Sequence, residues 1–143
     1  MIFTIGFTKK TAEEFFNRLI RAGVKRVIDI RLNNVSQLAG FAKKNDLIYF
    51  LRAIGGIDYI HRSDLAPTKE ILEAYKKNKG NWSVYERDFQ TLLLSRRVVE
   101  KLSPDLIDGA CLLCSEEKPE HCHRRLVSEY LSQKWPEMKI IHL

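Results

Sequence analysis

The chain has 143 residues, of which 45% are hydrophobic and 29% charged, an ordinary composition for a soluble globular protein. Its 24 basic and 18 acidic residues give a net charge of +6, which favours an anionic partner such as a nucleotide, a nucleic acid or a phosphorylated metabolite; a solvated charged surface is the alternative. No apolar run approaches the roughly 20 residues that span a bilayer, and the first residues resemble a strand rather than a signal peptide. We therefore expect a cytoplasmic protein with no membrane partner.

Strand and helix signals alternate along the chain. Ile2–Ile5 is a predicted strand, and the helix after it begins at Thr11, where Thr11 and Glu14 form a capping box, and ends at Gly23. The later predicted elements are strands at Val24–Ile30, Ile57–His61, Ala110–Cys114 and Lys139–His142, and helices at Asn45–Ile54, Pro67–Lys77, Trp82–Ser95 and Pro119–Lys134. This alternation predicts a single α/β domain over residues 1–143, with a mostly parallel sheet of four to five strands and helices on both faces.

The segment from Cys114 to Arg125 joins the fourth strand to the last helix and carries two thiols, two imidazoles, three carboxylates and two guanidiniums. The carboxyl ends of parallel strands are where ligands bind in α/β proteins. With Pro119 at the first helical position, the helix phase places Cys122, His123 and Arg124 near its buried face. A thiol at a helix N-terminus has a lowered pKa, so we expect Cys122 to be partly thiolate.

Three functional interpretations compete at this junction, beside a purely structural one. In the first interpretation, Cys114 or Cys122 is a nucleophile, and His123 or Glu116 transfers protons. In the second, the residues form a binding pocket in which Arg124 binds an anion. The third interpretation is a zinc site, but the eight-residue step between the cysteines matches none of the usual C-x-x-C pairings. We therefore expect no cofactor, with zinc as the exception to test. Cys111 is odd-spaced from Cys114 and is predicted to be core.

A second group of polar residues follows the neighbouring strands. Asp29 and Arg31 are two residues apart on one face of the second strand, at its carboxyl end, where a structural salt bridge is the alternative to a ligand site. His61 ends the third strand. Ser36, in the polar loop between residues 31 and 40, completes the predicted ligand-binding residues.

These residues resemble a family known as domain of unknown function 488. The shared motifs are a T-I-G at Thr4–Gly6, a D-[VI]-R at Asp29–Arg31, a Gly-Phe at Gly40–Phe41, a C-x-E at Cys114–Glu116 and a C-H-R at Cys122–Arg124. The chain departs from the family at Phe7, where many members have His. The resemblance implies a fold and a pocket more than a reaction. The strand–Cys–loop–helix layout is also similar in part to rhodanese-like sulfurtransferases, in which a strand-end Cys carries a persulfide.

The predicted function is a small enzyme or a nucleotide- or anion-binding protein, and whether it is an enzyme is left open. The alternatives are a non-catalytic DNA- or RNA-binding module and a thiol protein for sulfur transfer or redox sensing through a Cys114–Cys122 disulfide. The predicted catalytic residues are Asp29, Cys114, Glu116, Cys122 and His123, and the predicted ligand-binding residues are Arg31, Ser36, His61 and Arg124.

Overall fold

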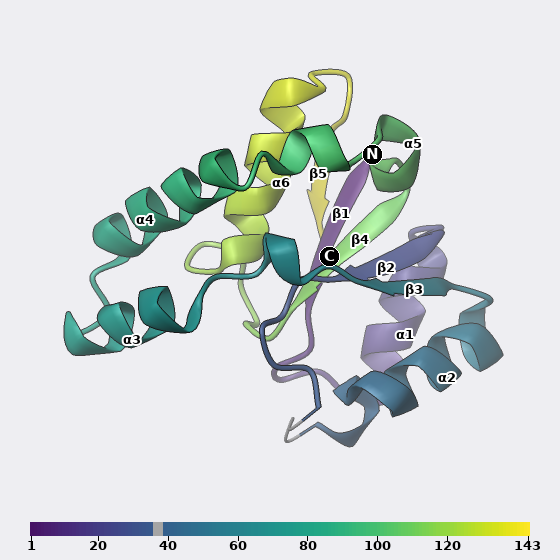
Figure 1. Cartoon of the computed structure of the whole chain (residues 1–143). Helices are drawn as coiled ribbons and strands as arrows, with labels where there is room; N and C mark the ends of the chain where they lie inside the picture. Colours follow the sequence, from purple (N-terminus) through teal and green to yellow (C-terminus); the bar gives the residue numbers. More distant parts are fainter. Residues whose placement is uncertain (36–38) are drawn as a thin grey trace.

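Five strands form one sheet in the order β3-β2-β4-β1-β5 (Figure 1). They are β1 (Ile2–Gly6), β2 (Arg26–Asp29), β3 (Asp58–His61), β4 (Ala110–Cys114) and β5 (Ile140–His142). The computed structural model describes residues 1–35 and 39–143, so Ser36 lies outside the described residues. All strand pairs are parallel, which confirms the predicted α/β class.

Helices connect the strands. They are α1 (Ala12–Arg21), α2 (Lys44–Gly55), α3 (Lys69–Lys77), α4 (Trp82–Ser95), α5 (Pro104–Ile107) and α6 (His123–Lys134). The side chain of Thr11 accepts from the Glu14 amide at 3.1 Å, which confirms half of the predicted capping box. Residue Gly56 ends α2 in the left-handed conformation that glycine adopts without a steric cost.

The helices cover the two faces of the sheet separately. The core on one face contains Phe15 and Leu19 from α1 and Leu47 from α2. The core on the other face contains Phe89 from α4 and Leu126 from α6. Burying each of these side chains contributes roughly 1.5–3 kcal/mol, so both faces stabilise the sheet. Helices on both faces confirm the prediction.

The connections place a crevice at the carboxyl end of β4. This strand is the middle one, and the chain leaves it toward α6 on one face, whereas β1 and β2 on either side lead to α1 and α2 on the other face. Such a change in direction opens a crevice between neighbouring strand ends, and ligands bind there in open α/β sheets. In Figure 1, α3 and the beginning of α4 extend beyond this side of the sheet.

The predicted start of the last helix was wrong. This helix begins at His123 and not at Pro119; residues 119–122 form a turn instead, in which the Cys122 amide donates to the Pro119 carbonyl at 3.1 Å. The short helix α5 was not among the predicted helices; the Ser103 side chain caps it by accepting from the Leu106 amide at 3.2 Å.

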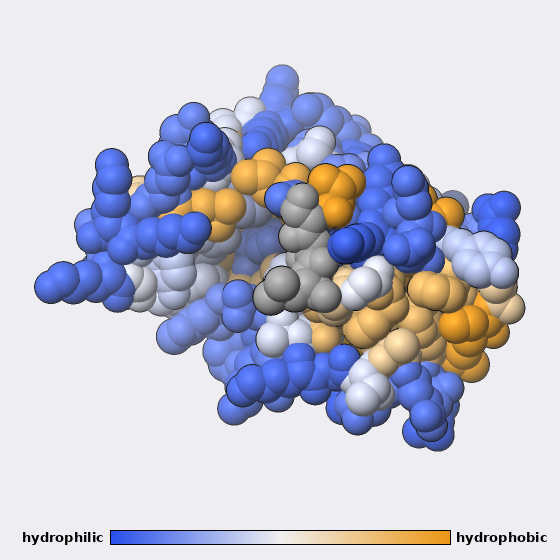
Figure 2. Space-filling model, turned by 90° about the horizontal axis from the view of Figure 1, so that it is seen from below, coloured by the Kyte–Doolittle hydropathy of each residue, from blue (hydrophilic) through white to orange (hydrophobic). Residues whose placement is uncertain are grey.

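Hydrophobic surface gathers on one side of the molecule in the view of Figure 2. Two of the exposed apolar residues, Tyr49 and Ile54, belong to α2, on the face of the sheet opposite α6. Within the described ranges, no helix combines the length and the apolar character needed to cross a membrane.

Candidate functional site

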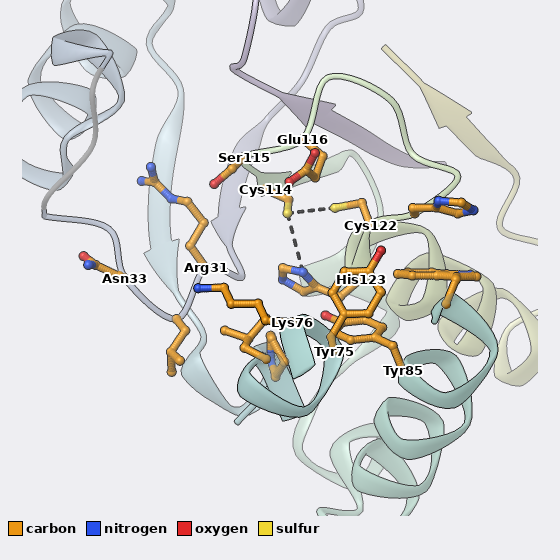
Figure 3. Close-up of a pocket in the computed structure, with 15 residues that line it drawn as sticks. Arg31, Asn33, Tyr75, Lys76, Tyr85, Cys114, Ser115, Glu116, Cys122 and His123 are labelled. Carbon is orange, nitrogen blue, oxygen red and sulfur yellow. Dashed lines mark hydrogen bonds between the residues drawn. The ribbon is translucent and has the colours of Figure 1, made fainter. Parts of the chain in front are cut away.

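Cys114, Cys122 and His123 meet at the end of the central strand (Figure 3). Cys114 is the last residue of β4, Cys122 immediately precedes α6, and His123 is its first residue. The two sulfur atoms lie 2.7 Å apart, and His123 Nδ1 lies 3.5 Å from the Cys114 sulfur. All three side chains are buried. The other ring nitrogen, His123 Nε2, lies 2.7 Å from the Ile30 carbonyl, which only accepts, so Nε2 carries a proton and the ring is fixed in orientation.

These contacts favour the thiolate form of Cys114. Burial alone would raise its pKa, but the thiol of Cys122, the ring of His123 and the backbone N–H of Glu116 all point at its sulfur and hold the pKa of Cys114 well below its usual range. Burial and the neighbouring Cys114 sulfur raise the pKa of Cys122. The pKa of His123 is raised although burial opposes it, because the Cys114 sulfur stabilises the imidazolium. The prediction that Cys122 is the partial thiolate was therefore wrong, since its thiol donates to Cys114.

Arg124 is fully buried and organises the loop after β4. Its guanidinium donates to the backbone carbonyl of Glu116 at 2.5 Å, to that of Glu117 at 3.2 Å and to Thr4 Oγ1 at 3.3 Å. These bonds hold the segment that carries the Glu116 amide against Cys114. The Arg124 side chain is not among those that line the cavity described below, so it positions the loop and leaves the predicted contact with an anion to other residues.

A second buried network surrounds Asp29. Arg31 donates to both carboxylate oxygens at 2.8 Å, and the Tyr59 hydroxyl donates to Oδ2 at 2.5 Å. Burial would raise the pKa of Asp29, but the bonds from Arg31 and Tyr59 outweigh it and lower the pKa. His61 Nε2 lies 3.0 Å from the Arg31 carbonyl, so it supports the backbone at this strand end. Asp29 and His61 thus hold the side chain and the backbone of Arg31 in place, and neither of them lines the cavity.

A cavity of about 440 Å³ opens above the two sulfur atoms, within the range of small-molecule sites. Figure 3 shows Ser115 and Glu116 on one side of the thiols and Tyr75, Lys76 and Tyr85 on the other. The remaining side chains around it are those of Arg31, Leu32, Asn33, Pro67, Leu72, Trp82, Cys114, His121, Cys122 and His123. The cavity is therefore apolar and aromatic on the α3–α4 side, with the sulfur atoms of Cys114 and Cys122 at its base.

Two residues of this cavity carry buried donors without a partner among the described residues, Arg31 Nη1 and Trp82 Nε1. The Arg31 guanidinium lies over the ring of Phe7, with its carbon 5.5 Å from the ring centroid, and Figure 3 shows it turned away from Cys114. Lys76 is the exposed cation of the cavity wall. An anion in this cavity would meet Lys76 first, and Lys76 was not among the predicted ligand-binding residues.

The Cys114 and Cys122 sulfurs and a ring nitrogen of His123 lie within 4.8 Å of one another, so these three residues could hold a metal ion. Thiolate and imidazole are the ligands that zinc prefers, and a ligating histidine usually donates its other N–H to a carbonyl or carboxylate. The bond between His123 Nε2 and the Ile30 carbonyl fits that arrangement.

The sequence predicted which residues of the candidate site come together, but it did not predict all of the residues that support them. Cys114, Cys122, His123 and Glu116 come together as predicted, with Arg31 on the neighbouring strand end. Gly6 was missed as a structural requirement, although a Cβ there would lie 1.6 Å from the Glu116 carbonyl oxygen. Cys111 is core on the opposite face, as predicted, and burial raises the pKa of its thiol.

Fold and site together define an α/β protein whose central parallel strand ends in a buried Cys–Cys–His cluster below a cavity. The family model described as "Domain of unknown function DUF488" matches residues 11–131, and the chain belongs to this family, as the motifs indicated. No curated protein and no solved structure matches the chain.

Proposed function

We propose that this protein is an enzyme in which the Cys114 thiolate attacks a small molecule bound in the cavity. The observation that carries the proposal is the set of three donors around one sulfur, namely the Cys122 thiol at 2.7 Å, His123 Nδ1 at 3.5 Å and the Glu116 backbone N–H. A thiolate is the reactive form of cysteine, and an adjacent histidine oriented by a third group is the usual sign of an activated nucleophile. The Ile30 carbonyl is that third group here.

Each residue then has a distinct part in the reaction. Cys114 is the nucleophile, and His123 gives a proton to the leaving group or takes one from the attacking group. Glu116 contributes its backbone N–H. Lys76 meets an anionic part of the substrate, and the aromatic wall that includes Tyr85 contacts its apolar part. A nucleotide with a reactive group is one molecule of this kind.

Alkylation with iodoacetamide tests the nucleophile. The reduced protein is treated at neutral pH, and the modified cysteine is identified by mass spectrometry of peptides. We expect Cys114 to react first, and the His123→Ala variant to react at least about tenfold more slowly, a conservative share of what general bases contribute. The matched control is His121→Ala, which removes an exposed imidazole stacked on Trp82, 5.0 Å between ring centroids, and leaves the thiols their partners. If Cys114 is alkylated no faster than Cys111, the proposal is wrong.

A metal centre is the second candidate, favoured by the three ligand atoms within 4.8 Å. Its test is titration of the reduced protein with Co²⁺, which develops a sulfur-to-metal charge-transfer band when thiolates bind it. The band should be absent from the Cys114→Ser and His123→Ala variants. A wild-type protein without a band at saturating Co²⁺ rules this candidate out.

The nucleic-acid partner stays a prediction. Three arginines, each next to another basic residue in the sequence, donate to backbone carbonyls of the fold: Arg26 donates to Leu106 at 2.7 Å, Arg96 to Ala66 at 2.6 Å and Arg124 to Glu116 at 2.5 Å. These guanidiniums are engaged in the fold, so they contribute less to a phosphate-binding surface than the sequence suggested.

A further inference from the structure

The site contains a second thiol, that of Cys122, which donates to the Cys114 sulfur and is also a second potential nucleophile. Cys122 occupies the N-cap position of α6, where residues such as Ser, Thr or Asp stabilise a helix by accepting from its first amides. Its side chain makes no such capping bond. The sulfur is turned instead toward Cys114, and both cysteines line the cavity. The side chain is therefore directed at the nucleophile rather than at the helix.

The distance between the two sulfur atoms is close to bonding range. A disulfide has a sulfur–sulfur length of about 2.05 Å, and the two sulfurs lie 2.7 Å apart as free thiols. An approach of less than an ångström joins them, which side-chain rotation at a strand end and at a helix N-cap can supply. Cys111, the other thiol, is fully buried in the core on the opposite face and takes no part.

We propose that Cys122 is a resolving thiol and that the substrate is a small disulfide, R–S–S–R′, with an anionic group. The inference rests on the proposed function of Cys114 as a nucleophile. A second thiol in bonding range can displace a mixed disulfide formed on the first by thiol–disulfide exchange. The cavity of about 440 Å³ holds a small molecule. Its apolar wall and Lys76 fit an organic disulfide that carries a carboxylate.

The reaction proceeds in two exchanges. The Cys114 thiolate attacks one substrate sulfur, so that a Cys114–S–R bond forms and the S–S bond of the substrate breaks; R′S⁻ leaves and takes the proton of the His123 imidazolium. Cys122 then gives its proton to His123 and attacks the Cys114 sulfur. The Cys114–Cys122 bond forms, the bond to R–S breaks, and R–S⁻ leaves with the proton from His123. The substrate gains two electrons, and the two cysteines lose them.

The enzyme returns to its dithiol form through a reducing co-substrate. A low-molecular-weight thiol supplied in excess reduces the Cys114–Cys122 disulfide by the same exchange chemistry. The open cavity gives such a thiol access to the Cys114 sulfur, which lies at its base. The overall reaction is the reduction of a small disulfide by a thiol.

The test uses dithiobis(nitrobenzoate), an aromatic disulfide with carboxylates, on the fully reduced protein in the presence of a chelator. We expect the wild-type protein to release both halves of the probe as coloured thiolates and to show no adduct, with Cys114 and Cys122 joined in one cross-linked peptide. The Cys122→Ser variant should release one half and retain the other on Cys114, visible as an added mass. The Cys111→Ala variant is the matched control and should behave like the wild type.

The outcomes separate this inference from the proposed function. A stable adduct on Cys114 in the wild type, as long-lived as in Cys122→Ser, would overturn the resolving role and leave Cys114 a nucleophile. Failure of Cys114 to react faster than Cys111 would overturn both. A Cys114–Cys122 disulfide that forms with peroxide but not with the aromatic disulfide would overturn the substrate class.

Discussion

Replacing Gly6 with alanine should disturb the site from a neighbouring strand. Gly6 ends β1 next to Cys114 on β4, and its Cα faces the loop after Cys114. A Cβ at this position would lie 1.6 Å from the Glu116 carbonyl oxygen and 2.8 Å from Arg124 Nη1, whereas real Cβ atoms essentially never approach within 3.0 Å. The loop must therefore move by more than an ångström, which breaks the 2.5 Å bond between Arg124 and the Glu116 carbonyl.

The magnitude follows from these two losses. Overpacking in a close-packed region costs about 1–3 kcal/mol, and a hydrogen bond to a charged group contributes about 1.5–3 kcal/mol. We therefore expect the free energy of unfolding of Gly6→Ala to fall by about 2.5–6 kcal/mol, out of the roughly 5–15 kcal/mol typical of native proteins. Alkylation of Cys114 should also slow, because the displaced loop takes the Glu116 amide away from its sulfur.

Urea unfolding followed by circular dichroism measures the first effect, and mass-spectrometric alkylation rates measure the second. Gly40→Ala is the control, because nothing among the described residues lies within 4 Å of a Cβ there; its effect should stay within about 0.5 kcal/mol. If Gly6→Ala unfolds at the same urea concentration as Gly40→Ala, the loop is not held against β1 and the reasoning is wrong.

Two further predictions concern the buried charges. Asp29→Asn should lower the free energy of unfolding at pH 7 by about 3–5 kcal/mol, because Arg31 is left buried without its carboxylate. The pKa of Asp29 is lowered in the fold, so its contribution is present above its unfolded pKa of about 3.9 and is lost as pH falls through the lower folded value. Stability measured by urea unfolding from pH 5 to pH 2 should therefore drop less in Asp29→Asn than in the wild type, and equal slopes would contradict this. Arg124→Met should cost about 2–4 kcal/mol by thermal unfolding, because the carbonyls of Glu116 and Glu117 and the Thr4 hydroxyl lose their donor; a change below about 0.5 kcal/mol would show that water replaces the guanidinium.

Periodicity and end signals predicted the fold because they report on local physics. Alternation of apolar runs with amphipathic stretches identified the five described strands, and Thr11 and Gly23 marked the two ends of the first helix. The boundary at Pro119 failed because a proline suits a turn as well as a first helical turn. The start of α6 depends instead on the loop before it, in which Arg124 donates to the carbonyls of Glu116 and Glu117.

The location of the candidate site could be predicted from the sequence, but the protonation states of its two thiols could not. Residue types at strand ends indicate where chemistry gathers, since parallel strands end at one edge. Which of the two thiols carries the charge depends on donors brought in by other segments, such as the Glu116 amide and the ring of His123. The place of Arg124 likewise depends on its partner Thr4 in β1, 120 residues away along the chain.

The dispersed motifs of the chain act on one short loop. Thr4 and Gly6 belong to one motif, Glu116 to a second and Arg124 to a third, and all of them contact the segment that follows Cys114 or the guanidinium that holds it. The loop must stay close to β1 for its Glu116 amide to reach the Cys114 sulfur, and only a residue without a side chain at position 6 permits that approach. Arg124 then secures the loop from the helix side. Arg124 is therefore a positioning residue, because its buried guanidinium holds the loop that donates to the Cys114 sulfur. Gly6 is equally necessary, because a Cβ at this position would displace the same loop.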